Sequence, residues 1–156
     1  MKYHANPEQF GLDTLVEQRI LGTSAFILSE HPLLKLQALL GRKLPTIYSD
    51  KNQINNLIKK DNPPFVESYP CSIPNWNNTP RSGTNGIVIK GVTIPLFKEQ
   101  LKRSLNRVRS RQSEQKTIFI KAWNEWAEGN HIEPNLQSGH KYLEAVKEAI
   151  EEEAHE

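Results

Sequence analysis

The clearest strand signal in the sequence is residues 117–122, which read TIFIKA. This stretch is almost continuously apolar and rich in β-branched and aromatic side chains, as in a parallel strand that other elements cover on both faces. Shorter segments of this kind stand at residues 12–17, 45–48 and 65–69, and residues 87–89 predict a small extra strand. Helical patterns separate these segments, so the chain predicts an α/β fold built on a parallel sheet.

The predicted helices carry apolar faces. The helix before residues 117–122 begins after Thr93, a candidate N-cap. Its apolar stripe consists of Phe97, Leu101, Leu105 and Val108. The last helix has three apolar side chains on one side, namely Leu143, Val146 and Ile150. Two further helices are predicted over residues 32–40 and 50–62, and a long polar loop over residues 70–86.

The number of predicted units suggests an incomplete barrel. The strands and helices make about four βα units, half of a (β/α)8 barrel, whose usual length is about 250 residues. We therefore expect residues 1–156 to be a single partial domain, the C-terminal part of a TIM-type barrel.

Composition excludes several classes of protein. No apolar run approaches the ~20 residues of a membrane span, and the first residues lack the apolar stretch of a signal peptide, so we expect a cytoplasmic protein without a membrane span. The single cysteine, Cys71, rules out an internal disulfide and a cysteine-built zinc site. The five histidines show no metal-ligand spacing, and no glycine-rich phosphate loop is present. We expect neither a metal nor a cofactor.

Charge is unevenly distributed, although the net charge is only +2. Residues 98–121 hold 8 basic and 2 acidic residues, whereas residues 122–156 hold 2 basic and 9 acidic ones. A nucleic-acid-binding protein usually has a more basic total, with aromatic side chains among its cations. We therefore expect no nucleic-acid partner and interpret the basic segment as a solvated helix face.

The segment that carries chemistry follows the predicted strand directly, where residues 122–134 read AWNEWAEGNHIEP. Ligands of parallel α/β sheets bind at the carboxyl ends of the strands. Glu125 and Glu128 are three residues apart, so one helical turn would place their β-carbons roughly 5–6 Å apart. Two carboxyl groups about 5 Å apart suit the chemistry of a glycosidic bond. The alternative reading is a solvated loop with two glutamates and buried tryptophans.

Aromatic and polar side chains accompany the two glutamates. Three tryptophans supply flat apolar faces on which sugar rings can stack: Trp76, Trp123 and Trp126. Asn124 can both donate and accept hydrogen bonds. His131 is a candidate for lining the site because it lies in the same loop, although an ordinary loop histidine is the simpler reading. Glu133 is either a hydrogen-bond partner behind the site or a plain surface carboxylate.

Two blocks of this sequence resemble the WbsX-type glycosyltransferase family, which is itself similar to glycoside hydrolase family 99, the endo-acting α-mannosidases. The C-terminal block comprises WNEWAEG at residues 123–129, IEP at 132–134, Gly139, and YLEA at 142–145. The upstream block comprises residues 69–70, WNNTPR at 76–81, and Gly83. The resemblance covers residues 60–150 well and residues 10–60 weakly.

The resemblance implies a (β/α)8 barrel that acts on a glycan without a metal. By motif position, Glu125 is the base that deprotonates the substrate's own 2-hydroxyl, and Glu128 is the general acid and then the base. By block position, Trp76 and Arg81 contact the sugar, with loop packing as the alternative reading. Relatives of this type are found among O-antigen genes, which implies a role in bacterial surface-polysaccharide metabolism, by transfer or by retaining hydrolysis.

The sequence departs from the family pattern in two respects. Asn77 stands where the family block usually has an aspartate, which removes a charge that could orient a sugar hydroxyl or an arginine. We expect the N-terminal half of the barrel to be absent from this chain, which would expose unpaired strand edges. We therefore expect a separate N-terminal barrel half as a partner, and no turnover by the isolated chain. The alternatives are a non-catalytic carbohydrate-binding or assembly partner and an inert gene fragment.

Overall fold

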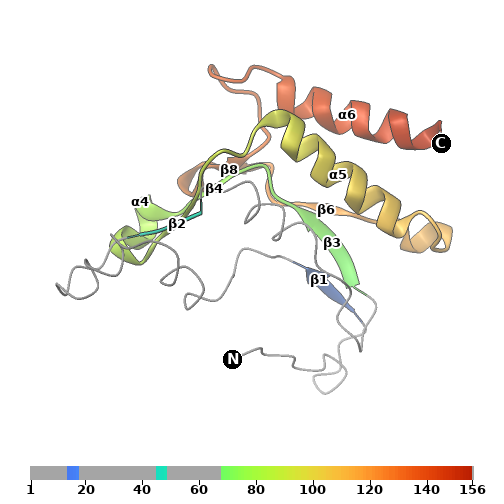
Figure 1. The fold of residues 1–156 in the computed structure, drawn as a ribbon, viewed down its shortest axis with the longest axis horizontal. Helices are drawn as coiled ribbons and strands as arrows, with labels where there is room; N and C mark the ends of the chain where they lie inside the picture. Colours follow the sequence, from blue (N-terminus) through green and yellow to red (C-terminus); the bar gives the residue numbers. More distant parts are fainter. Residues whose placement is uncertain (1–13, 18–44, 49–67, 156) are drawn as a thin grey trace.

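The computed structural model describes residues 14–17, 45–48 and 68–155 (Figure 1). The helices predicted over residues 32–40 and 50–62 lie outside these ranges. None of the helices in the described ranges combines the length and the apolar character that a membrane crossing requires.

Three short strands form a parallel sheet in the order β1–β3–β6. They are β1 (Leu15–Glu17), β3 (Ser68–Ser72) and β6 (Phe119–Ile120). Ser72, the last residue of β3, pairs with Ile120, the last residue of β6. β3 therefore extends three residues beyond the predicted strand, whose residues 65–67 lie outside the described ranges.

A second small sheet has the order β2–β5–β4. It joins β2 (Thr46–Tyr48), β5 (Ile87–Ile89) and β4 (Trp76–Asn77). β2 and β5 are parallel, and β4 runs antiparallel to β5. The small strand predicted over residues 87–89 is confirmed, and the strand predicted over residues 45–48 pairs with it rather than with the β1–β3–β6 sheet.

The prediction of a polar loop over residues 70–86 is wrong. Besides the end of β3, this stretch contains β4, the short helix α4 (Thr79–Ser82) and a 3-10 turn (Gly83–Asn85). Hydrogen bonds from side-chain amides hold these elements in place. A prediction based on the spacing of apolar residues therefore does not find them. The Asn78 carboxamide oxygen, for example, accepts a hydrogen bond from the Ile87 amide at 2.6 Å.

β6 is shorter than the predicted strand, and the described elements do not cover it on both faces. Ile118 and Ile120 pack against the hydrophobic core, whereas the intervening Phe119 is exposed and meets the Tyr69 ring edge-on. Successive side chains of a strand point to opposite faces, so the apolar face that holds Phe119 lies away from the core. The prediction of a strand covered on both faces is therefore wrong at this position.

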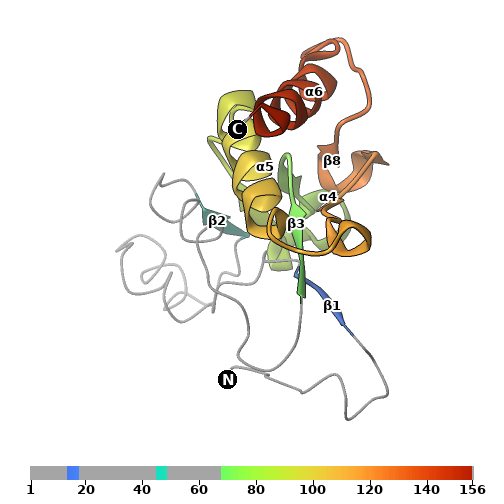
Figure 2. The ribbon, with the colours of Figure 1, turned by 90° about the vertical axis from the view of Figure 1, so that its right-hand side faces the viewer.

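Two helices, α5 (Ile94–Val108) and α6 (Lys141–Ala154), pack against each other and supply most of the core (Figures 1, 2). The predicted cap is confirmed, since the Thr93 side chain accepts a hydrogen bond from the Leu96 amide. The predicted stripe of α5 is confirmed too, because all four residues are buried or pack against the core. In α6, Ile150 is exposed, and the two buried residues are Ala145 and Ala149. Leu143 and Val146 pack against the core, so the predicted face is confirmed for these two residues and wrong for Ile150. The prediction did not include the two alanines, whose small side chains let the helices pack closely.

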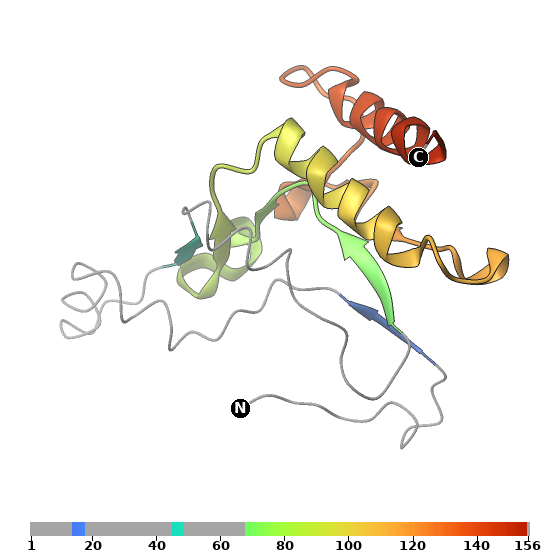
Figure 3. The ribbon, with the colours of Figure 1, turned by 45° about the vertical axis from the view of Figure 1, so that its right-hand side comes forward.

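A polar seam fastens α5 to β3, which lies beside it in Figure 3. Ser104 and Ser72 share a buried hydroxyl–hydroxyl hydrogen bond of 3.0 Å. Three more hydrogen bonds flank it. The Gln100 side chain accepts from the Ile73 amide, and Arg107 donates to the Ser68 hydroxyl. Arg111, which follows the helix, donates to the Ser68 carbonyl. The seam helps to set the position of α5 along β3, since hydrogen bonds weaken steeply when their geometry is poor.

The basic segment of α5 pairs with the acidic C-terminal helix. Lys98 Nζ lies 2.6 Å from Glu148 and 2.7 Å from Glu152, and Lys102 Nζ lies 2.9 Å from Glu152. These contacts hold the pKa of Lys98 above its usual value and that of Glu152 below its usual value. The two lysines therefore pair with carboxylates of α6 across the helix surface, which the interpretation of the segment as a solvated face did not include.

We expect Ser104→Ala to destabilise the protein by about 1–3 kcal/mol, because the buried Ser72 hydroxyl loses its partner. The double variant Ser72→Ala/Ser104→Ala should be close to wild type, since neither hydroxyl is then left unpaired. Urea unfolding of the two single variants and the double variant measures the coupling, with exposed Ser110→Ala as the control. Additive losses in the double variant would contradict the seam.

We expect Glu152→Gln to lower the melting temperature, and the loss to shrink as salt is added, because added ions screen exposed charges. Since the pKa of Glu152 is lower in the folded than in the unfolded state, its contribution is present above about pH 4.5 and is lost as pH falls below it. Thermal melts across pH and salt test this expectation. Glu144→Gln, an exposed carboxylate on the same helix outside the cluster, is the matched control.

Candidate functional site

The parallel pairing of β3 and β6 brings two loops together at one end of the sheet. Because Ser72 pairs with Ile120, the chain segments that follow both strands leave at the same edge. The Lys121 amide continues this pairing by donating to the Ser72 carbonyl at 3.0 Å. The upstream block and the glutamate motif therefore meet where parallel sheets bind ligands.

The glutamate motif folds as a small hairpin around a 3-10 turn. β7 (Asn124–Glu125) pairs antiparallel with β8 (Asn130–His131), and residues Trp126–Glu128 form the turn η4. Gly129 ends the turn in the left-handed conformation, with φ of +57°, which explains the glycine at this position. The hairpin differs from the single helical turn expected for the two glutamates, since Glu125 ends a strand and Glu128 ends the 3-10 turn.

One guanidinium group connects the two carboxylates. Arg81 Nη2 lies 3.4 Å from Glu125 Oε1, and Arg81 Nη1 lies 3.3 Å from Glu128 Oε1. Both carboxylates therefore face the same side of the hairpin, and a positive charge lies between them. This charge offsets the repulsion that two neighbouring carboxylates would otherwise experience.

A second cation contacts the other oxygen of Glu128. Lys121 Nζ lies 3.6 Å from Glu128 Oε2 and 4.5 Å from the centre of the Trp76 ring. Glu128 is only 8% exposed, so its carboxylate requires such partners. Trp76 is 6% exposed and carries the ammonium group on its ring, so its expected role as an open stacking surface does not match this placement. It supports Lys121 instead.

Asn77 positions the helix that carries Arg81. Its carboxamide oxygen accepts hydrogen bonds from the Thr79 amide at 3.1 Å and the Thr79 hydroxyl at 2.7 Å, at the start of α4. This contact requires an acceptor oxygen but no charge, so an asparagine can make it. Arg81 takes its negative partners from the two glutamates rather than from position 77.

A buried asparagine fastens the motif to both neighbouring segments. Asn130 is fully buried, and its side-chain carboxamide lies against the backbone oxygens of Asn75 and Lys121. The orientation that satisfies these acceptors turns the side-chain NH2 group toward them, so that it donates to both. The hairpin is therefore tied to the loop after β3 and to the end of β6. Neither Asn130 nor Lys121 is among the residues predicted for the site, although a lone lysine at the end of an apolar strand is a signal for Lys121.

Trp126, His131 and Glu133 form one contact chain on the hairpin. The Trp126 and His131 rings are stacked, with centroids 3.8 Å apart, and Trp126 Nε1 donates to Glu133 Oε2 at 2.7 Å. Glu133 thus orients Trp126, which matches the reading of Glu133 as a hydrogen-bond partner behind the site. Asn124 and Trp123 are exposed on the same hairpin.

Hydrogen bonds define the protonation of His131. The Asn135 carboxamide oxygen accepts from the amides of Gln137 and Ser138, so its NH2 group faces His131 Nε2 at 3.1 Å. Nε2 is therefore the acceptor, and the neutral ring carries its proton on the buried Nδ1. Burial lowers the pKa of His131, and the nearby Glu133 charge opposes this effect only in part.

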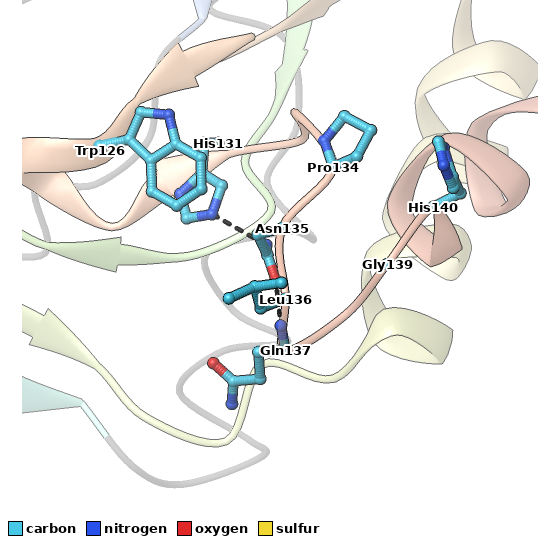
Figure 4. A pocket seen from close by; sticks show the side chains of 8 residues that line it. All are labelled: Trp126, His131, Pro134, Asn135, Leu136, Gln137, Gly139 and His140. Atoms are coloured by element: carbon cyan, nitrogen blue, oxygen red, sulfur yellow. Dashed lines mark hydrogen bonds between the residues drawn. The ribbon is translucent and has the colours of Figure 1, made fainter.

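A cavity of about 680 Å³ lies on the Trp126 side of the hairpin, and Figure 4 shows its lining. Trp126 and His131 stand at one side of the cavity, and His140 stands at the other. The loop over residues 134–139 runs between them. Glu125 and Glu128 do not line this cavity, so the hollow and the carboxylate pair occupy different sides of the motif. Within the described residues, no group of three or more His, Cys, Asp or Glu side chains could hold a metal ion.

We expect an NMR titration to place the pKa of His131 below its usual value of about 6.5. Because the folded state holds the neutral ring, the unfolded state takes up a proton first, and stability should fall as pH drops below about 6.5. Asn135→Asp should raise the pKa of His131, since a carboxylate oxygen would replace the donor facing Nε2. A wild-type pKa at or above the usual value would contradict this assignment.

Comparisons with known proteins support the resemblance to the WbsX family that the two sequence blocks indicate. A family model described as "Glycosyltransferase WbsX" matches residues 2–146. Two proteins named "Uncharacterized protein WxcX", from two strains of Xanthomonas campestris pv. campestris, are each 34% identical to this chain over 83 residues. The aligned part is 53% of this chain but 12% of each WxcX protein. No solved structure matches the chain. Since the family model covers nearly all residues, the chain belongs to the WbsX glycosyltransferase family.

Proposed function

We propose that this chain is the catalytic C-terminal part of a glycan-active enzyme that resembles glycoside hydrolase family 99 and has a (β/α)8 barrel. Its role would lie in bacterial surface-polysaccharide metabolism. The observation that carries the proposal is the shared Arg81 contact, which holds Glu125 and Glu128 on one side of the motif. Family membership supports a glycan as the substrate.

The two carboxylates can complete a retaining reaction without a metal. The reaction begins with Glu125 ionised and Glu128 protonated. Glu125 takes the proton of the sugar's 2-hydroxyl, whose oxygen attacks the anomeric carbon while the bond to the leaving oxygen breaks. The Glu128 carboxyl group gives its proton to that leaving oxygen and becomes a carboxylate. In the second step, Glu128 takes a proton from water or from an acceptor hydroxyl, whose oxygen attacks the anomeric carbon. The bond to the 2-oxygen breaks as the new bond forms, and Glu125 returns its proton to the 2-oxygen. Water gives hydrolysis, and a sugar hydroxyl gives transfer.

Without substrate, the cationic side chains of Arg81 and Lys121 occupy the positions around Glu128, and a bound substrate must displace one of them. Both oxygens of Glu128 face a cation, one from Arg81 and one from Lys121. Glu128 can protonate a leaving oxygen only after a contact to substrate replaces one of these contacts. Arg81 is the residue better placed to move, because its side chain is largely exposed, whereas Lys121 is held against the Trp76 ring.

A non-catalytic carbohydrate-binding role is the second candidate. Two exposed tryptophans, Trp123 and Trp126, and a cavity that no Asp, Glu, Lys or Arg side chain lines suffice to hold a sugar without any reaction. This role would use the aromatic side of the hairpin and would not depend on the carboxylates.

Substitution of the carboxylates separates the two roles. In the complete gene product that contains these residues, we expect Glu128→Gln and Glu125→Gln each to lower turnover by about 10²–10⁴-fold, because an amide cannot perform the proton transfers. Surface polysaccharide from the source bacterium is the test glycan, with products followed by mass spectrometry and binding by calorimetry. Binding should change little, since amide and carboxylate have nearly the same shape.

Glu144→Gln serves as the control, because this exposed carboxylate lies on α6 away from the motif. Turnover within about threefold of wild type in both glutamine variants would refute the catalytic assignment, since it is far below the usual contribution of acid–base catalysis. Binding of the polysaccharide without turnover, even by the wild-type protein, would favour the carbohydrate-binding role.

A further inference from the structure

Hydrogen bonds within the loop over residues 134–139 hold the rim of the cavity beside Trp126 in place. The Asn135 carbonyl accepts from the Gly139 amide at 2.8 Å, and the Asn135 side chain accepts from two further amides of the same loop. Gly139 has φ of +56°, a conformation that favours glycine. Through its NH2 group, Asn135 also holds His131, which stacks on Trp126. One residue therefore connects the loop to the aromatic wall.

The lining of this cavity carries no full charge from acidic, lysine or arginine side chains. Its apolar surfaces come from Trp126, Pro134 and Leu136, and its polar groups are amides and imidazoles. Burial keeps His131 neutral by lowering its pKa. An anionic ligand such as a nucleoside diphosphate or a uronic acid would find no cation here, whereas a neutral ring with apolar faces and hydroxyl edges matches both kinds of surface.

The apolar part of the lining is open to solvent. Leu136 is fully exposed, and half of the Trp126 surface is accessible. Exposed apolar surface around a hollow, with polar groups at its rim, is typical of a ligand-binding site. The hollow has a volume of about 680 Å³ and is open to solvent over much of its extent, so a bound ring would be only partly enclosed.

The cavity adjoins the carboxylate pair through a single residue. Trp126 follows Glu125 directly and precedes Glu128 in the same 3-10 turn. The two carboxylates face Arg81. Trp126 borders the cavity, as Figure 4 shows. A glycan chain that passes over this turn would therefore reach the carboxylates with one sugar unit and the cavity with another.

We propose that the cavity formed by Trp126 and the loop over residues 134–140 is a binding subsite for a neutral pyranose ring, next to the unit on which the carboxylates act. This subsite rests on the proposed function for its place in a reaction, but its binding can be measured without catalysis. Trp126 supplies the stacking surface, Gln137 and His140 face the ring hydroxyls, and Asn135 is the positioning residue.

The test uses NMR of the labelled protein, with methyl α-D-glucopyranoside, methyl α-D-galactopyranoside, methyl α-D-mannopyranoside and methyl α-L-rhamnopyranoside as neutral probes. Glucuronic acid and uridine diphosphate are the charged probes. We expect at least one neutral probe to shift the indole signal of Trp126 and the amides of residues 134–140, and the charged probes to leave them in place. The Trp123 indole, equally exposed but outside the cavity, is the internal reference.

Variants assign the binding to the cavity. Trp126→Ala should weaken binding by about tenfold, as truncation of an aromatic anchor usually does. Leu136→Ser should weaken it as well, and this variant should fold normally because Leu136 is fully exposed. Binding should persist in the double variant Glu125→Gln/Glu128→Gln, since neither carboxylate lines the cavity.

Several results would overturn the inference: no shift at Trp126 with any neutral probe, equal or larger shifts at Trp123, tighter binding of a charged probe, or unchanged affinity in Leu136→Ser. The outcomes also distinguish the two proposals. Loss of turnover in the glutamine variants without probe binding at Trp126 would remove the subsite and leave the catalytic assignment standing. Probe binding at Trp126 with full turnover in those variants would remove the catalytic assignment and leave the subsite standing.

Discussion

The parallel pairing of β6 with β3 is the constraint on which the candidate site depends. It aligns the ends of two strands that are nearly fifty residues apart in sequence, so the loop after each strand emerges at the same edge. The first loop leads through β4 to α4 and Arg81, and the second folds into the hairpin with Glu125 and Glu128. The polar seam between α5 and β3 holds the connecting helix in register, which keeps the two loop origins opposite each other.

Charge pairing organises the described part of the molecule at two scales. Along the chain, a basic segment precedes an acidic one, and the fold places lysines of α5 against glutamates of α6. Within the site, Arg81 and Lys121 do the same for the two motif glutamates. The two cases differ in solvent exposure. The helix pairs are exposed and screened by salt, whereas Glu128 is nearly buried, so removing its cations would leave a costly unpaired charge.

The hairpin presents two chemically different sides from one short turn. Its carboxylates face the cations, and its tryptophan and histidine border a cavity with no charged residue other than histidine in its lining. Sharp turns make this division possible, because a 3-10 turn rotates successive side chains by about 120°. Residues that adjoin in sequence can thereby perform separate tasks on one bound chain.

The sequence by itself determined those elements that depend on residue propensity and on apolar periodicity within one short segment. The cap at Thr93, the apolar stripe of α5 and the small strand at residues 87–89 follow from propensity and periodicity, and all three are present. The paired glutamates and the family were also readable, because a dense motif of tryptophans and glutamates is rare by chance. Only the tertiary structure decided which partners these residues have. The burial of Trp76 under Lys121, the bridging position of Arg81 and the role of Asn135 all join segments through side-chain contacts. Such contacts depend on how separate segments pack together. A pattern along the chain does not give the distance in space between residues that are far apart in sequence.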